Sequence, residues 1–393
     1  MIIRTNLLSS VATSRVAVYI SGLLTAILLT SLSNFILPSS SSPASSTPHE
    51  LLQTNSYQYP SGYNLPSTEN IVNHLEYTTS INYRLKMPNW VSERLNSSSV
   101  ADKSGNRGNS DFQPDPSVPE SFRAANNDYL GTGWSRGHLA RSENHRSSQQ
   151  VTDETFLLSS NIVPQDLSMN GCDWLRLENL ALSLAQTPAS NVYIISGPLW
   201  LPVKDAFNKL VTTFEFIGKK QMPVPTHLFK ILMIDDFRGK ASAAFIMPNR
   251  PILEHKPLSY FQVQIEEVEV AAGLDLTGMK SGTDLCQITD CLQIQKNKRT
   301  DAWRMYGRIQ VASEMDSIRL LVVEAIDKGY FDDANFLLVK LVRDKVTRLM
   351  PNQSLEASLF PNGADSNYQA ILNTGMEALK NRDQAWKAKY PRQ

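Results

Sequence analysis

Short apolar runs that end at glycine or proline dominate the middle of this chain, and they constrain its fold more than any other feature. Their length and their β-branched and aromatic content suit buried strands. The runs are residues 156–163, 191–196, 227–234 and 241–247. A helical pattern that Asn170 can cap runs among them to about Gln186. We therefore predict an α+β domain over roughly residues 76–285.

The segments before these runs are less regular. Residues 87–95 read as a short helix begun by Pro88. Residues 96–120 are rich in Ser, Asn, Gly and Pro, and they read as one long loop of the functional or mobile kind. Residues 50–75 are polar and turn-rich, so we expect them to form a peripheral arm.

The last hundred or so residues, 286–393, change to helical spacing. Apolar side chains recur every three or four positions up to Ile326, and Gly329 can close that helix. A second helix is predicted to start at Asp332 or Asp333. We predict that this part forms a helical C-terminal subdomain.

The amino terminus carries no acidic residue before Glu50. Residues 1–15 are basic and rich in Ser and Thr, as in mitochondrial targeting segments. Residues 16–37 carry no charge and are long enough to span a bilayer as one helix. Residues 38–75 would be a linker followed by the arm. We predict anchoring in a mitochondrial membrane, the inner one; the alternative is a cleaved secretory signal, whose apolar region is normally shorter.

Composition excludes several classes of protein. The 393 residues include 38 Lys and Arg and 38 Asp and Glu, so bulk charge does not drive nucleic-acid binding, although a local basic cleft stays open. The cysteines are Cys172, Cys286 and Cys291, which form no CxxC pair. This argues against a disulfide scaffold and a structural zinc site, and we expect the cysteines to be small buried or incidental residues.

A group of polar residues in the middle of the chain suits phosphodiester hydrolysis. A histidine can deprotonate water near neutral pH, and an amide oxygen with a nearby carboxylate can hold a hydrated Mg²⁺. An arginine can neutralise a phosphoryl oxygen, and a glycine lets the backbone turn so that the histidine faces the helix. Taken singly, each has a commoner structural explanation, so the case rests on their order and spacing. The residues are Arg136, Gly137, His138, Asn161, Asn170 and Glu178.

The sequence segments around these residues resemble those of a known family. SRGHLA, FLLSSNIVPQD, MNGCDWLRLENL and NVYIISGPLWLP are similar to the DNA/RNA non-specific endonucleases of the ββα-metal (His-Me finger) fold. Within that family they are most similar to the mitochondrial exo/endonuclease G (EXOG) type. The resemblance implies a central, mostly antiparallel sheet flanked by helices. It also implies that the helical tail is the C-terminal wing of that branch.

The resemblance assigns a role to each position. His138 would be the general base, Asn170 the direct ligand of a single Mg²⁺, and Glu178 the acid that holds the water shell of that ion, with Mn²⁺ as a possible substitute. Arg136 would support the transition state and Asn161 would be a supporting polar residue. Many family members have Asp where this chain has Ser135, and we interpret Ser135 as a mark of the EXOG-like branch.

The implied activity is sequence-independent cutting of DNA, with RNA as a second candidate substrate, and with 5′→3′ exonuclease as well as endonuclease action. A homodimer is also implied. The alternatives are a nuclease-fold binding protein that has lost activity and a secreted nuclease. Of the other candidates, His145 is predicted to be a surface or phosphate-contacting residue, and His227 a residue of the core or beside the site. Trp134 and Trp174 are expected to be core residues and not platforms for bases.

Overall fold

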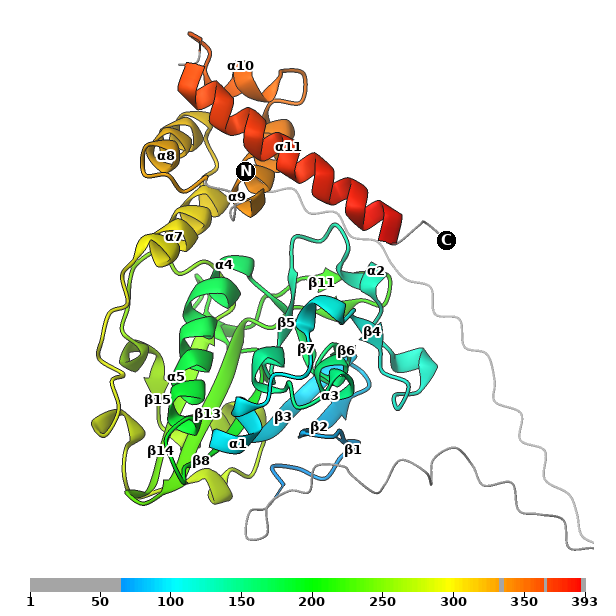
Figure 1. The fold of residues 1–393 in the computed structure, drawn as a ribbon, viewed down its shortest axis with the longest axis vertical. Helices are drawn as coiled ribbons and strands as arrows, with labels where there is room; N and C mark the ends of the chain where they lie inside the picture. The colour runs from blue at the N-terminus through cyan, green and yellow to red at the C-terminus, as the bar shows by residue number, and fades with distance from the viewer. Residues whose placement is uncertain (1–64, 332–335, 364–365, 390–393) are drawn as a thin grey trace, which may run out of the picture. The chain divides into compact units, whose positions relative to one another are not determined.

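The computed structural model describes residues 65–331, 336–363 and 366–389 (Figure 1). The predicted targeting segment 1–15, the predicted span 16–37 and most of the linker lie outside these residues, as do Asp332 and Asp333. Within the described ranges, no helix is both long enough and apolar enough to cross a membrane.

A central antiparallel sheet organises the described part of the chain, with seven strands in the order β1-β2-β3-β8-β13-β14-β15. The strands are β1 Ile71–Asn73, β2 Tyr77–Asn82, β3 Met87–Asn96, β8 Asn191–Leu199, β13 His227–Asp236, β14 Gly239–Pro248 and β15 Gln262–Val263. The predicted strands 191–196, 227–234 and 241–247 are confirmed, and the α+β class with a mostly antiparallel sheet is correct.

The predicted helix over residues 87–95 is wrong, because this segment is strand β3. Its side chains alternate between the two faces of the sheet: Val91 and Leu95 pack in one core cluster, and Trp90 packs in the other. A strand buried on both faces lacks the apolar/polar alternation of a half-buried strand, and Pro88 at its start imitates a helix beginning.

A helix covers each face of the sheet. On one face, α5 Leu175–Ala185 places Leu177, Ala181 and Leu184 in a core cluster with side chains of β8 and β13 (Figure 1). On the other face, α6 Ile265–Ala272 packs Ile265 and Val268 against Trp90 and side chains of β13. The spacing of three and four residues along each helix produces these apolar stripes.

A small second sheet has the order β4-β6-β7-β5. Its strands are β4 Gln113–Pro114, β6 Leu157–Leu158, β7 Ile162–Gln165 and β5 Ser135–His138. The predicted single strand 156–163 is therefore two strands, and the second continues through Pro164. Because β5 holds Arg136 and His138, this small sheet sets where the candidate base lies.

The predicted long loop 96–120 contains short elements of its own. Within it lie α1 Ser97–Ala101 and η1 Arg107–Asn109. The remaining short elements of the described chain are the helical turns η2 Glu120–Phe122, α2 Asn126–Tyr129, η3 Ser142–Asn144, α3 Gln149–Glu154, η5 Leu258–Phe261, η6 Thr277–Met279 and η7 Leu285–Gln287. Two hairpins pair β9 Val203–Lys204 with β10 Leu210–Val211, and β11 Phe216–Ile217 with β12 Met222–Pro223.

The C-terminal part of the described chain is helical, with its own core cluster. Its helices are α7 Lys298–Val311, α8 Met315–Asp327, α9 Phe336–Leu349, α10 Leu355–Leu359 and α11 Ser366–Lys389. Gly329 follows α8 with a φ of 65°, so it closes that helix as expected. The sequence missed α7, α10 and α11, and the boundary at residue 286 stays a prediction.

The cysteine expectation needs one correction. Cys286 and Cys291 form a disulfide bond, whereas Cys172 is a free, buried thiol. Cys286 lies within η7, and Cys291 follows it five residues later. The two cysteines are five residues apart, so a search for CxxC pairs does not detect them.

Candidate active site

Strand β5 ends at His138 and pairs antiparallel with β7, with His138 opposite Ile162. Gly137 lies within strand β5 and not in a tight turn, which corrects the expectation from the sequence, and the Gln165 side chain fills the space beside it. A Cβ atom at residue 137 would lie 1.7 Å from the Oε1 atom of Gln165, a distance that excludes any side chain without local rearrangement.

The imidazole of His138 lies in an aromatic enclosure and is only 8% exposed. Phe156 packs edge-on against it with ring centroids 4.8 Å apart, and the Phe112 centroid is 5.5 Å away. The buried Nε2 atom has no hydrogen-bond partner among the described residues. A buried polar atom without a partner is costly in a protein interior, so this nitrogen calls for a ligand, a water or a proton.

An arginine lies over each of these two phenylalanine rings. The Arg136 guanidinium stacks 4.2 Å from the Phe112 centroid and donates to Oδ1 of Asn126 at 2.6 Å. The exposed Arg107 of η1 lies 5.8 Å from the Phe156 centroid. Burial, together with the charges of Arg107 and Arg136, lowers the pKa of His138 to about 3. The imidazole is therefore neutral near pH 7 and can accept a proton.

Sequence reasoning missed Arg107. It belongs to the segment read as one long loop, and no motif marks it. The sequence signal that could have found it was a basic residue in an irregular segment of suspected function. The structure adds that β4, in the same segment, pairs with β6.

Asn161 holds the backbone that follows His138. Its amide group donates to the carbonyl oxygens of Ala140 and Thr155 at 2.8 Å, and its Oδ1 atom accepts from the Ala140 amide at 2.7 Å. Because it is fully buried and its side chain is satisfied, the geometry favours a bracing role over contact with a substrate. Lys230 adds to this support by donating to the Leu139 carbonyl at 2.9 Å.

Asn170 begins a π-helical turn, η4 Asn170–Trp174, that connects α4 Leu167–Met169 to α5. The predicted cap at Asn170 is wrong, because the Asp166 side chain caps this helix by accepting from the Met169 amide at 2.9 Å. The Asn170 amide group donates weakly to Ser135 Oγ at 3.5 Å. Its oxygen is thereby left available to bind an external group.

The π-helical turn and strand β5 lie against each other. Besides the contact of Asn170 with Ser135, Trp174 Nε1 donates to the His138 carbonyl at 3.3 Å. These contacts place Asn170 and His138 on neighbouring elements of one region. Trp174 is fully buried, as expected for a core residue, whereas Trp134 is only partly buried.

Glu178 lies on α5, two turns after Asn170, and faces the same region. Its Oε2 atom is 3.5 Å from Nε of Arg141, and it is only 7% exposed. Burial raises the pKa of Glu178 to about 7, against the lowering influence of Lys230 and Arg141. Arg141 lies in the segment that follows His138, and Lys230 donates to the Leu139 carbonyl of the same segment. The two cations that act on the Glu178 carboxyl group therefore belong to, or contact, the chain next to the candidate base.

The oxygen donors suit a hard, hydrated cation. Asn170 offers one amide oxygen and Glu178 one carboxylate, which matches a Mg²⁺ ion that keeps several waters. The described residues contain no cluster of three or more His, Cys, Asp or Glu side chains that could hold a metal ion by themselves. A closed zinc site with four protein ligands therefore does not fit this region.

His145 is not a surface or phosphate-contacting residue, which corrects the prediction. It is 1% exposed and bridges two carboxylates: Nδ1 lies 2.9 Å from Oε2 of Glu76, and Nε2 lies 2.6 Å from Oε2 of Glu93. Burial alone would lower its pKa, but the two hydrogen-bonded carboxylates raise the pKa of His145 to about 9. His227 is half-buried on β13 and contacts Thr226.

This ion-paired histidine predicts a pH-dependent stability. The folded pKa of about 9 exceeds the ordinary 6.5, so the contribution is fully present below pH 6.5 and is lost as the pH rises through 9. We expect the free energy of unfolding to fall by about 3 kcal/mol across this window. Urea denaturation at several pH values would measure it. His145→Gln should flatten the slope, and an equally steep slope in that variant would contradict the assignment.

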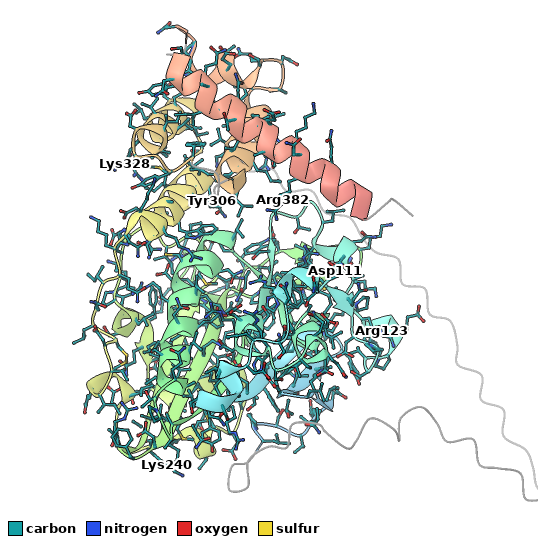
Figure 2. All side chains as sticks on the ribbon, viewed as in Figure 1. Asp111, Arg123, Lys240, Tyr306, Lys328 and Arg382 are labelled. Carbon is teal, nitrogen blue, oxygen red and sulfur yellow. A yellow bond between two sulfur atoms is a disulfide. The ribbon has the colours of Figure 1, made fainter. Side chains whose placement is uncertain are left out.

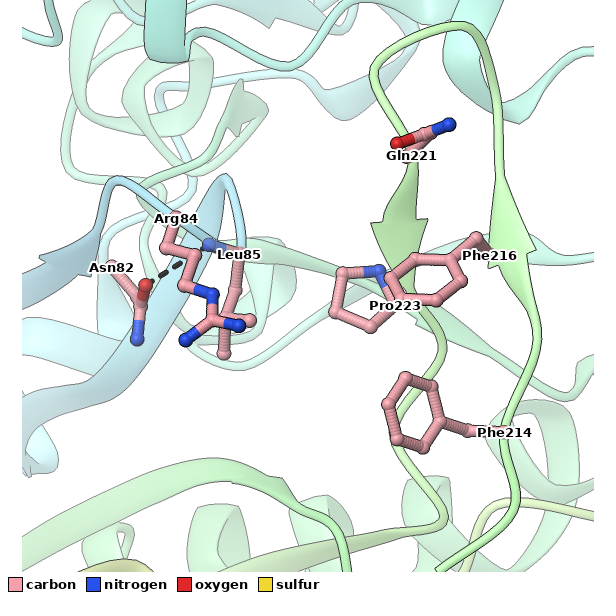
Figure 3. A pocket seen from close by; sticks show the side chains of 7 residues that line it. All are labelled: Asn82, Arg84, Leu85, Phe214, Phe216, Gln221 and Pro223. Carbon is pink, nitrogen blue, oxygen red and sulfur yellow. Dashed lines mark hydrogen bonds between the residues drawn. The ribbon is translucent and has the colours of Figure 1, made fainter. Parts of the chain in front are cut away.

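A pocket of about 310 Å³ lies outside this region, between the turn that joins β2 to β3 and the β11–β12 hairpin (Figure 3). Its lining residues are Asn82, Arg84, Leu85, Phe214, Phe216, Gln221 and Pro223. It contains none of the residues predicted to act on a phosphodiester, and its walls are mainly apolar. We therefore place the candidate site by side-chain chemistry around His138 and not by this pocket.

The chain is similar to known nucleases over much of its length. The sequence profile of the DNA/RNA non-specific endonuclease family matches residues 55–280. Mitochondrial endonuclease G of Bos taurus is 40% identical over 213 residues, which are 54% of this chain and 70% of that protein. Mitochondrial nuclease EXOG of Danio rerio is 34% identical over 274 residues, 68% of this chain and 78% of that protein. A chain of the crystal structure of the EndoG/EndoGI complex is 36% identical with a TM-score of 0.53, and the match covers 56% of this chain and 90% of that chain.

Proposed function

Because the chain belongs to the DNA/RNA non-specific endonuclease family, and is therefore a nucleic-acid-hydrolysing enzyme, we propose that His138 is the general base of its active site. The substrate would be DNA, with RNA as a second substrate. The observation that carries the proposal is the buried, unpartnered Nε2 atom of a neutral imidazole, flanked by Arg107 and Arg136. This arrangement can accept a proton beside a site for a phosphate anion.

The positive charges also explain how a weak base becomes competent. Without an anion, Arg107 and Arg136 help to keep the pKa of His138 low. A phosphate that enters beside them brings negative charge, which offsets theirs and raises the proton affinity of the imidazole. His138 then takes a proton from water, and Arg136 neutralises a phosphoryl oxygen. No group in this step reads a base, which fits sequence-independent cutting.

Asn170 and Glu178 would hold the cation. The Asn170 amide oxygen would be the direct protein ligand, and Glu178 would orient the water shell. When bound, Mg²⁺ supplies positive charge that stabilises the developing charge on the phosphate and the leaving oxygen, and Mn²⁺ can take its place. We also propose 5′→3′ exonuclease action in addition to endonuclease action, which is what the resemblance to the EXOG type implies.

The proposed location is the mitochondrion, since the relatives of Bos taurus and Danio rerio are both named mitochondrial. Residues 16–37 would anchor the enzyme in the inner membrane. Carbonate extraction of mitochondria that contain a tagged chain would test this, because a freely extracted chain would contradict the anchor. The homodimer stays an expectation from the resemblance.

Removing the metal should abolish cutting. With Mg²⁺ present, we expect relaxation of supercoiled plasmid and shortening of end-labelled linear DNA, and EDTA should lower both rates by at least about a hundredfold. Added Mg²⁺ or Mn²⁺ should restore both. Comparing circular with linear substrates separates endonuclease from exonuclease action. Cutting that persists in EDTA would contradict the proposed metal dependence.

A further inference from the structure

Helix α7 lies beyond the family match, yet it contacts the turn that carries Asn170. Figure 1 shows α7 beside α4, and Figure 2 labels Tyr306 on α7. The first contact is at Gly171, directly after Asn170. A Cβ atom at residue 171 would lie 2.4 Å from the ring of Trp303, so the indole occupies the space where a side chain would be. The indole thus closes one side of the turn.

The second contact is a buried ion pair at the other end of the turn. Nη1 and Nη2 of Arg304 donate to Oδ2 and Oδ1 of Asp173 at 2.6 and 2.8 Å, a bidentate geometry. Asp173 is fully buried and Arg304 is 6% exposed. Arg304 also donates to the Ile252 carbonyl at 2.7 Å. Such a pair restricts the orientation of both planar groups, and therefore of the backbone at Asp173.

The third contact is at the helix cap before Asn170. Nε2 of Gln310 donates to Oδ2 of Asp166 at 2.7 Å, while Oδ1 of Asp166 caps the helix at Met169. The carbonyl oxygen of Asp166 accepts from the Asn170 amide at 2.9 Å. One helix therefore contacts the residue that caps the helix before the π-helical turn and two residues within the turn. Turns of this kind are wider than an α-helical turn and recur at functional sites, which is a reason for external support.

We propose that α7 positions Asn170 for metal binding, with Arg304 as the principal positioning residue, so that the C-terminal helices set the affinity of the nuclease site for its divalent cation. The inference rests on the proposed function. It connects the C-terminal helices to the proposed metal ligand through the direct contacts of α7 with the turn that carries Asn170. The predicted effect is on metal affinity, because Arg304 influences the substrate region only by holding the turn that carries Asn170.

Mn²⁺ binding to the purified chain tests the proposal, with free Mn²⁺ measured by electron paramagnetic resonance. Arg304→Ala should weaken Mn²⁺ binding at least tenfold, Arg304→Lys less, and Gln310→Leu by a smaller factor. The concentration of Mg²⁺ for half-maximal cleavage should rise in parallel, while the rate at saturating Mg²⁺ changes less than threefold. Asp173 also pairs with Arg176 at 3.1 Å, and these substitutions leave both partners of that pair in place, which favours folding.

Arg308→Ala is the matched control. Arg308 lies on the same helix but pairs with Glu324 of α8, so its loss should leave Mn²⁺ binding unchanged. If folded Arg304→Ala binds Mn²⁺ as the wild type does, the proposal is overturned. If that variant does not fold, wild-type affinity in both Arg304→Lys and Gln310→Leu overturns it. A wild-type chain that neither binds Mn²⁺ nor cuts DNA would instead refute the proposed function.

Discussion

Replacing His138 with alanine will lower plasmid cleavage by about a thousandfold, within the range that a positioned general base contributes. The variant removes the imidazole nitrogen that is proposed to take the proton from water, while Arg107, Arg136 and Asn170 stay in place. DNA binding and Mn²⁺ binding should therefore change little. Initial rates of nicking at saturating Mg²⁺ would check the first expectation. DNA binding measured in EDTA, and Mn²⁺ binding measured without EDTA, would check the second.

His227→Asn is a suitable control, because His227 lies half-buried on β13 and contacts only the neighbouring Thr226 hydroxyl in the hydrogen bonds described. It should retain activity within a few fold. Added imidazole should partly rescue His138→Ala, since removal of the ring leaves a space between Phe112 and Phe156. Rapid cutting by His138→Ala without imidazole would remove this residue from the role of base.

Features with a regular local signal were predictable from the sequence. Strands β8, β13 and β14 are apolar runs bounded by turn residues, and α5 shows a clear stripe on one face. Strand β3 has no such signal, because both of its faces are buried and its apolar positions do not alternate with polar ones. The C-terminal helices were only partly predicted, since α7 has a weak stripe: its buried side includes Arg304 and Thr300.

Within the candidate site, sequence motifs identified the candidate residues but did not predict which side chains surround them. The ion pairs of His145 depend on Glu76 and Glu93, which come from other parts of the chain and meet it only in the folded protein. Arg107 likewise reaches the region of His138 from a segment without periodicity. Long-range contacts of this kind set pKa values and charges, and no local pattern encodes them. Gly137 is a similar case: the sequence assigned it to a tight turn, whereas the structure places it in β5 with the Gln165 side chain against it.

Replacing Asn170 with alanine should cost about as much activity as the loss of His138, but through the metal. Removal of the amide oxygen leaves no direct protein ligand among the residues proposed to hold Mg²⁺, and the charge stabilisation that the ion supplies is worth several kcal/mol. We expect at least about a hundredfold lower cleavage at low millimolar Mg²⁺, together with weaker Mn²⁺ binding. Titration of the metal would separate the two variants, because excess Mg²⁺ should partly restore Asn170→Ala and leave His138→Ala inactive.

Asn170→Asp supplies the sharper test of the ligand assignment. It keeps an oxygen at the same position and adds a negative charge, which attracts a divalent cation more strongly. The Asp variant should therefore bind Mn²⁺ at least as tightly as the wild type, although the added charge beside the phosphate would slow cleavage. The weak contact with Ser135 at 3.5 Å is unlike a structural anchor, so neither variant should unfold the turn that α7 holds. Equal Mn²⁺ affinity in the wild type, the Ala variant and the Asp variant would show that this oxygen does not bind the metal.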